Sequence, residues 1–257
     1  MTVLLVDIGN TRIKWAHFTR GRLGKARAAV HSRWGPAEYA RHLFAAGAKV
    51  ERLLVASVAG PGVKGALTTA ARRAGIEARF VHVPRRGGGV TVGYSEPWRL
   101  GVDRFVAAVG AHSLFEGVAV CVVGVGTAMT IDLIDARGRH RGGVIIPAPE
   151  LMVATLFDST YGIRRRARGG AKGGAALFGR STRAGVVQGA RHAAAALIDR
   201  AAQEAQSLLG RKPLVVLTGG EAPSVRALVQ SACVGVPDLV LRGLGVLLEL
   251  TPPELGR

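Results

Sequence analysis

A short polar turn near the N-terminus carries residue types that could bind phosphate and a metal ion. It follows an apolar run and reads Asp7-Ile8-Gly9-Asn10-Thr11-Arg12-Ile13-Lys14. Gly9 permits a sharp turn and close backbone approach, and exposed backbone N–H groups in such a turn can donate to phosphate oxygens, as can Asn10 and Thr11. Lys14 adds positive charge, and Asp7 can hold Mg²⁺ through water. An ordinary hairpin explains the same residues, because Gly9-Asn10 is good turn chemistry.

A second turn repeats this arrangement 117 positions further along the chain. The run Val120 to Val123 leads into Gly124-Val125-Gly126-Thr127-Ala128, with hydroxyl groups in place of Asn. Neither turn has the GxxxxGK[ST] pattern, so the P-loop class is disfavoured. A repeated strand–turn–strand unit predicts two lobes on the same plan, each offering a turn to a shared cleft. The boundary falls between Leu114 and Val118, giving lobes of residues 1–116 and 117–257.

The elements that must position these turns alternate in type. Short Val, Ile and Leu runs alternate with longer Ala-rich segments, which is typical of an α/β protein. Strands are expected at 3–6, 13–18, 53–57, 118–123, 130–134, 143–146 and 214–217. Helices are expected at 36–46, 62–74, 102–115, 148–157, 182–208, 224–231 and 239–250.

The segment Gly101-Val102-Asp103-Arg104 opens one of these helices. An Asp in a first helical turn caps free N–H groups and is stabilised by the helix dipole. The same carboxylate could act as a general base that takes the proton from a substrate hydroxyl. Arg104 beside it could grip a substrate carboxylate. The sequence leaves both interpretations of Asp103 open.

Two further features are open to a bland and a functional interpretation. Asp132, on the strand after the second turn, is either a second metal-facing carboxylate or an outward-pointing strand residue. Gly219 and Gly220 end the run Leu214 to Leu217. Adjacent glycines there allow the close approach of a flat ring such as adenine, or form a plain strand-to-helix turn.

The net charge of +18 raises the question of an anionic partner. Clustered basic residues would favour binding to nucleic acid, because binding releases the counterions around the phosphates. Here the basic residues are spread along the chain, and an anionic small-molecule substrate with a solvated surface is favoured over nucleic acid. The densest run, Arg164 to Arg168, is followed by two glycines and predicts a mobile surface loop.

Other sequence features bear on cellular location. The most apolar stretch, Val144 to Phe157, is interrupted by prolines and a Glu, so no run approaches the ~18 residues of a membrane span. The N-terminal MTVLLVD is expected to be a core strand rather than a secretory signal. Two cysteines, Cys121 and Cys233, are too few for a disulfide framework, which favours a reducing cytoplasm.

Taken in order, several motifs resemble those of the type III pantothenate kinases. They are DIGNTRIK, Tyr94 followed by LGVDR, GTAMTIDL, RGGVIIP, the Ser-Thr pair at 181–182, and VVLTGGE. Each is weak alone, but together they cover residues 3 to about 245, and the resemblance extends to the Bvg accessory factor-like branch. It implies two actin-like (ribonuclease H-like) lobes of the acetate/sugar kinase and actin ATPase superfamily. It also implies a homodimer, with the substrate site near the subunit interface, and the reaction of ATP with pantothenate to give 4′-phosphopantothenate and ADP.

The resemblance assigns a role to each matching residue. It makes Asp103 the catalytic base, and it makes the turn from Asp7 to Lys14 the site of ATP phosphates and Mg²⁺. The resemblance places Thr127 against an ATP phosphate. The Gly219–Gly220 pair is also compatible with ATP binding. Pantothenate would contact Tyr94, Gly101, Val102, Arg104 and Thr182. Tyr94 is otherwise a half-buried loop aromatic, and Thr182 is otherwise a helix N-terminal hydroxyl, with Ser181 competing for that cap.

The sequence departs from the family pattern at two positions. Many members have an Asp where this chain has Gly124, and that Asp binds a monovalent cation such as K⁺ or NH4⁺. Gly124 supplies no side-chain ligand, so a K⁺ requirement is in doubt. The Pro-Gly that often closes the RGGVIIP element is Pro147-Ala148 here. A kinase for another hydroxylated acid and a nucleotide-binding regulator without turnover are the competing functions, and the intact Asp103 and first turn argue against the regulator.

Overall fold

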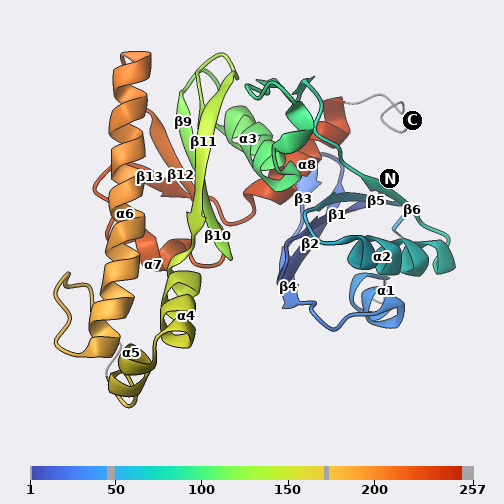
Figure 1. The fold of residues 1–257 in the computed structure, drawn as a ribbon. Coiled ribbons are helices and arrows are strands. Elements are labelled where there is room, and N and C mark those ends of the chain that lie inside the picture. The colour runs from blue at the N-terminus through green and yellow to red at the C-terminus, as the bar shows by residue number, and fades with distance from the viewer. Residues whose placement is uncertain (1, 45–49, 171–173, 251–257) are drawn as a thin grey trace. The chain divides into compact units, whose positions relative to one another are not determined.

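A computed structural model describes residues 2–44, 50–170 and 174–250 of the chain (Figure 1). The chain divides into two compact units. The first contains residues up to Glu116, Gly138–His140 and the chain from Asp238 onward, and the second contains Gly117–Arg137 and Arg141–Pro237.

The first unit is a mixed sheet with helices on both faces. Its strands are β1 (Thr2–Ile8), β2 (Arg12–Thr19), β3 (Arg22–Leu23), β4 (Arg27–Val30), β5 (Arg52–Ser57) and β6 (Glu77–Phe80), with a separate hairpin of β7 (Arg86–Gly87) and β8 (Val90–Thr91). Its helices are α1 (Pro36–Phe44), α2 (Pro61–Arg73), the 3₁₀ turn η1 (Pro97–Arg99), α3 (Val102–Leu114) and α8 (Leu239–Leu250). The sheet order is β3-β2-β1-β5-β6, and β4 also pairs with β2.

The alternation of side chains along β1 decides which residues meet which helices. Successive side chains of a strand point to opposite faces. Leu4, Val6 and Ile8 belong to a core shared with α1 and α2. Asp7 therefore projects from the opposite face, on which α3 and α8 contact the sheet (Figure 1).

The second unit repeats the same strand plan. Its strands are β9 (Val120–Val125), β10 (Ala128–Ile134), β11 (His140–Pro147), β12 (Leu214–Thr218) and β13 (Cys233–Gly235), in the order β11-β10-β9-β12-β13. Its helices are α4 (Pro149–Ser159), α5 (Tyr161–Arg166), α6 (Thr182–Leu209) and α7 (Ala222–Arg226). In both units the first strand, β1 or β9, pairs antiparallel with the strand that follows it and parallel with a later strand, β5 or β12.

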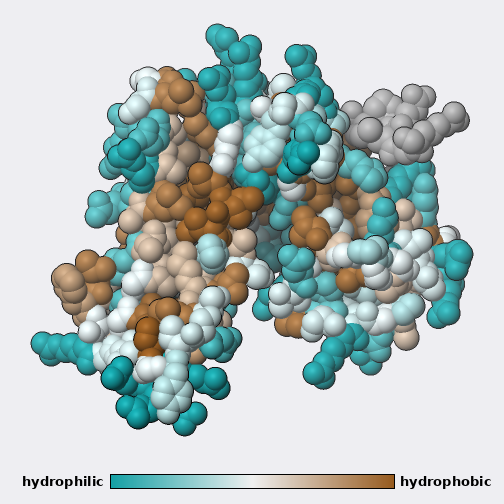
Figure 2. Space-filling model, in the orientation of Figure 1, coloured by the Kyte–Doolittle hydropathy of each residue, from teal (hydrophilic) through white to brown (hydrophobic). Residues whose placement is uncertain are grey.

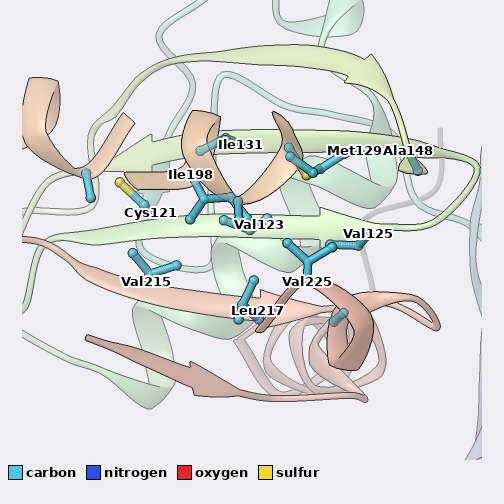
Figure 3. Close-up of a cluster of buried hydrophobic side chains, with 14 of the residues drawn as sticks. Cys121, Val123, Val125, Met129, Ile131, Ala148, Ile198, Val215, Leu217 and Val225 are labelled. Atoms are coloured by element: carbon cyan, nitrogen blue, oxygen red, sulfur yellow. The ribbon is translucent and has the colours of Figure 1, made fainter. Parts of the chain in front are cut away.

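The core of the second unit lies between its sheet and helices α6 and α7 (Figure 3). Val123 and Val125 of β9 and Leu217 of β12 point toward Ile198 of α6 and Val225 of α7, and all five are almost fully buried. Full burial of an aliphatic side chain stabilises the fold by about 1.5–3 kcal/mol. Gly124 lies between Val123 and Val125 and so belongs to the other face of the sheet.

The C-terminal helix corrects the expected division into residues 1–116 and 117–257. Helix α8 packs on α3 and on β1 of the first unit. Gly110 of α3 and Gly243 of α8 face one another so closely that a Cβ at Gly243 would overlap the carbonyl of Val106. Small residues at such a crossing let two helix backbones approach, and this packing is invisible in the linear sequence. The segment Gly138–His140 likewise packs with the first unit.

The structure also corrects the loop that was expected for the basic run Arg164 to Arg168. Arg164, Arg165 and Arg166 form the last turn of helix α5, which follows α4 after the single residue Thr160. Arg is a good helix former, so the expected loop is wrong for these residues, and part of the following glycine-rich stretch, 171–173, lies outside the described residues. Within the described chain no helix has the length and apolar character to span a membrane.

Candidate active site

The first turn joins β1 to β2 through residues 9–11. Asp7 pairs with Lys14 and Ile8 with Ile13 across the two strands, and the Gly9 N–H donates to the Arg12 carbonyl over 3.0 Å. Asn10, Thr11 and Arg12 are exposed, whereas Ile8 and Ile13 are buried in the core. Ile8 and Ile13 can therefore offer a ligand only their backbone, and the exposed tip carries the polar groups.

A buried histidine lies directly behind this turn, and sequence reasoning missed it. His31 Nε2 is 2.8 Å from the Gly9 carbonyl oxygen, and the His31 backbone N–H donates to the Thr11 carbonyl over 3.2 Å. His31 follows β4, whose pairing with β2 was also not expected. No local motif marks this residue.

The electrostatics of Asp7 connect the first turn to helix α3. Burial, followed by the charge of Asp103, raises the pKa of Asp7 to about 7, and Lys14 opposes this shift. Two carboxylates within electrostatic range of one another are unfavourable when both are ionised. They would become favourable with a divalent cation present, which is the arrangement that a metal-dependent phosphoryl transfer uses.

Asp103 lies at the second position of α3, where both sequence interpretations meet. Its Oδ1 accepts the backbone N–H of Arg104 over 2.9 Å, and the helix begins with the Phe105 N–H donating to the Gly101 carbonyl over 3.0 Å. The helix dipole stabilises a negative charge at this end. Asp103 thus caps a free N–H and at the same time lies within electrostatic range of Asp7.

Arg104, the residue after Asp103, contacts the side chain of Tyr94. The Arg104 guanidinium is buried, with 7% of the residue exposed, and donates to the Tyr94 hydroxyl over 3.3 Å. It also lies 5.9 Å from the centre of the Tyr94 ring. The sequence predicted both residues, but it did not predict the ring of His140, which packs against Tyr94 at 5.5 Å. Arg85, also missed, donates to the backbone carbonyls of Tyr94 and Ser95 and so holds this loop.

The second turn, in the other unit, is tighter. The Gly126 N–H donates to the Ala128 carbonyl over 3.0 Å, and the Thr127 carbonyl accepts the Ala148 N–H over 3.2 Å. Thr127 is exposed at the tip. A Cβ at Gly124 would lie 3.1 Å from Thr130 Oγ1, so the position is crowded. Among the described residues no group of three or more His, Cys, Asp or Glu side chains could hold a metal ion.

Gly219 and Gly220, which the sequence treated as a pair, have different structural roles. Gly219 has a φ of +102°, and a Cβ there would overlap the Val125 carbonyl. Gly220 has no neighbour within 4 Å of its Cβ position and lines a cavity of about 520 Å³. That cavity is bordered by α4, α6 and α7 and includes Glu150, Phe157, Arg183, Arg191 and Glu221. Gly219 is thus required by packing, and Gly220 borders open space.

The second unit bears on two alternatives that the sequence left open, Thr182 and Asp132. Ser181 caps α6 through its Oγ, which accepts the Ala184 N–H over 3.1 Å, so Thr182 is not the capping residue. Asp132 is only 2% exposed, which excludes a solvent-facing strand residue. Its side chain leaves the sheet on the face of Thr130 and Gly124, opposite Ile131.

The duplicated architecture identifies the class of protein. In each unit the first strand has an antiparallel neighbour on one side and a parallel neighbour on the other. Two units of this kind form the fold of actin-like ATPases and sugar kinases. A ROK family glucokinase from Streptomyces griseus, in complex with glucose and AMPPNP, shares the fold with a TM-score of 0.52 and 13% identity over 95% of this chain and 98% of its own. A Campylobacter jejuni protein assigned to the Baf family of transcriptional activators has a TM-score of 0.57 and 17% identity over 96% and 97% of the two chains.

Sequence similarity narrows this class to one family. The type III pantothenate kinase profile matches residues 3–204. The type III pantothenate kinase of Nitrosococcus oceani is 34% identical over 247 residues, which cover 94% of this chain and 92% of the relative. The chain belongs to the type III pantothenate kinase family, whose reaction is the first step of coenzyme A biosynthesis. The predicted family and fold are confirmed.

Proposed function

We propose that this chain transfers the γ-phosphoryl group of ATP to the primary hydroxyl of pantothenate, giving 4′-phosphopantothenate and ADP. The observation that carries the proposal is the electrostatic coupling of Asp7 and Asp103 beside a polar turn in the first unit. Asp7 lies just before the first turn, and Asp103 lies at the N-terminus of α3 next to the Arg104 guanidinium. Family membership supplies the identity of the acceptor.

Mg²⁺ fits the carboxylate at the turn. Burial and then the charge of Asp103 raise the pKa of Asp7, so a bound cation would favour the ionised carboxylate. When bound, Mg²⁺ would neutralise charge on the phosphate oxygens, and Asp7 would hold it, through water. Lys14 and the N–H groups of the exposed tip would orient the ATP phosphates.

Asp103 is the proposed general base. It would accept the proton of the pantothenate hydroxyl while the oxygen forms a bond to the γ-phosphorus and the bond to the β-phosphate oxygen breaks. Arg104 and the Tyr94 hydroxyl would bind the pantothenate carboxylate, since a guanidinium forms strong charge-assisted hydrogen bonds with it. Gly101 and Val102, at the start of α3, would contact the substrate near the base.

The second unit is proposed to supply further contacts. Thr127 would donate to an ATP phosphate, and Gly219 and Gly220 would lie along the adenosine. Thr182, whose hydroxyl is not the helix cap, would contact pantothenate. A monovalent cation site at Gly124 has no side-chain ligand from that residue, and we propose that turnover does not require K⁺.

We also propose a cytoplasmic homodimer. The second unit exposes several large apolar side chains on β11, α4, α5 and the segment before α6, and Figure 2 shows brown, apolar surface on this unit. They include Ile145, Leu156, Tyr161, Leu177 and Phe178. Large exposed apolar patches are typical of interfaces, and the exposed apolar side chains of this unit support a subunit contact there. Sedimentation equilibrium showing a monomer at micromolar concentration would contradict the dimer.

The reaction is tested by measuring ADP release from Mg²⁺-ATP with and without pantothenate. We expect pantothenate-dependent ADP, and a loss of at least about 10²-fold in kcat for Asp103→Asn, because Asn cannot accept the proton. ATP binding should persist in that variant. Glu116→Gln, an exposed acid just beyond the other end of α3, is the matched control and should be unchanged.

Two results would contradict the assignment. ATP binding by the unaltered protein without pantothenate-dependent ADP would refute the kinase function. Full activity of Asp103→Asn would refute the base.

A further inference from the structure

His31 makes three hydrogen bonds that join the first turn to the core of its unit. Only 2% of the residue is exposed. Its Nε2 meets the Gly9 carbonyl at 2.8 Å, its Nδ1 meets the Tyr39 hydroxyl at 3.0 Å, and its backbone N–H meets the Thr11 carbonyl at 3.2 Å. A buried polar side chain with every ring nitrogen engaged fixes its partners in place.

The partners determine where the ring proton lies. A carbonyl oxygen only accepts, so the Nε2 of His31 must carry hydrogen and donate to Gly9. In the neutral ring Nδ1 is then the acceptor, and the Tyr39 hydroxyl is its donor. Burial raises the pKa of Tyr39, so the phenol keeps the proton that it donates. Tyr39 thereby selects the tautomer that can hold Gly9.

The bond to Gly9 also sets the direction of the next amide. A peptide unit is planar and trans, and the described chain contains no cis peptide. The Asn10 N–H is therefore antiparallel to the Gly9 carbonyl. Because that carbonyl points inward to His31, the Asn10 N–H points outward, to the exposed tip of the turn.

We propose that His31 is a positioning residue for the nucleotide phosphates, which holds the Gly9 carbonyl inward so that the Asn10 N–H faces the ligand. The proposal rests on the proposed function of the turn as a phosphate site. Without the His31 donor, the peptide between Gly9 and Asn10 is free to rotate and present a carbonyl oxygen, which repels phosphate.

A matched control exists in the same aromatic cluster. The ring of His42 stacks on Trp34 with a centroid distance of 4.2 Å, and Trp34 in turn packs edge-on against His31 at 6.5 Å. Loss of the His42 ring therefore disturbs the same cluster without removing a hydrogen bond to the turn. His31→Leu and His42→Leu separate positioning from packing.

The experiment measures the Kd of Mg²⁺-ATP by calorimetry, the KM values of ATP and pantothenate, and Tm for both variants. For His31→Leu we expect the Kd and KM of ATP to rise about tenfold, the effect of a lost hydrogen bond that leaves a carbonyl unpaired. The KM of pantothenate should stay within about twofold, because Tyr94 and Arg104 bind it elsewhere. His42→Leu should lower Tm with no change in ATP affinity.

Conservative variants keep the test decisive if His31→Leu does not fold. His31→Gln, whose amide can donate to Gly9, should recover ATP affinity to within about threefold. Tyr39→Phe should weaken ATP binding less than His31→Leu does. ¹⁵N NMR of the histidine rings should show His31 protonated at Nε2, and protonation at Nδ1 alone would overturn the proposal.

Two outcomes distinguish this proposal from the proposed function. Equal ATP affinity in His31→Leu and the unaltered protein would overturn the positioning role even if pantothenate is phosphorylated. If only His31→Gln folds, a loss of ATP affinity of about tenfold or more in that variant would overturn it, because the Gln amide still supplies a donor to Gly9. Absence of pantothenate-dependent ADP would overturn the acceptor, and a tenfold loss of ATP affinity in His31→Leu alone would still support the role of His31.

Discussion

The two strand–turn–strand hairpins share a backbone plan but differ in the group that ends the first strand. In the first unit Asp7 pairs with Lys14, and residues 9–11 form the loop. In the second unit Gly124 pairs with Thr130, and the loop is residues 126–127. The longer loop exposes polar side chains at its tip, whereas the shorter one exposes Thr127 between small residues.

The first hairpin carries an ionisable group, whereas the second hairpin is closely packed against another part of its unit. The first hairpin holds a titratable carboxylate whose pKa responds to Asp103. In the second hairpin, Gly219 lies so close to the Val125 carbonyl at the end of β9 that no side chain fits at position 219. A duplicated fold therefore allows one copy to carry ionisable groups while the other is shaped for close backbone approach.

The largest expected effect is on the stability of the fold and concerns the close packing at Gly219. Gly219→Ala places a Cβ against Val125 at a positive φ, and we expect a loss of roughly 2–4 kcal/mol in the free energy of unfolding. Gly220→Ala, the adjacent control with open space around its Cβ position, should change stability by less than about 1 kcal/mol. Urea denaturation measures both, and similar losses in the two variants would contradict the distinction.

The next effect concerns the charged hairpin. The pKa of Asp7 is raised from 3.8 to about 7, so between these pH values the folded chain holds a proton that the unfolded chain has released. Stability from this group is therefore present at low pH and lost as the pH rises through the window. In EDTA, Asp7→Asn should be more stable than the unaltered protein at pH 8 by on the order of 2 kcal/mol.

Below about pH 3 the two proteins should be equally stable, because Asp7 is then protonated in both the folded and unfolded states of the unaltered chain. Thermal denaturation across this range measures the difference. A difference in stability that does not vary with pH would show that Asp7 is not the titrating group.

The smallest expected effect concerns the second hairpin. Since Gly124 has no side-chain oxygen, and K⁺ would need oxygen ligands as other hard cations do, replacing Na⁺ by K⁺ should change kcat by less than about twofold. ADP release in matched chloride buffers measures this. A strong K⁺ requirement would mean that backbone carbonyls and water hold the ion.

Much of the fold was predictable because its signals are local. Apolar runs followed by glycine-containing turns predicted β1, β2, β9 and β10, and the 117-residue repeat predicted two units on one plan. Short edge strands such as β4 (Arg27–Val30) were missed, because its residues have little strand preference and pairing with β2 holds it in place.

Residues of the candidate site could be predicted from the sequence when they stand in one of the short motifs. Asp7, Asp103 and Arg104 stand in such motifs. His31, Arg85 and His140 do not, because each acts on a partner that is distant in sequence: Gly9, the loop at Tyr94, and the Tyr94 ring. Their importance depends on proximity created by folding.

The sequence by itself determined the family, the repeated hairpins and the residue types at the first turn, because these depend on local pattern and order. Only the tertiary structure decided that α8 returns to the first unit, that Ser181 rather than Thr182 caps α6, and that Asp7 and Asp103 share one electrostatic environment. Electrostatic and packing free energies depend on distance in space and on burial, and neither quantity can be read from separation along the chain.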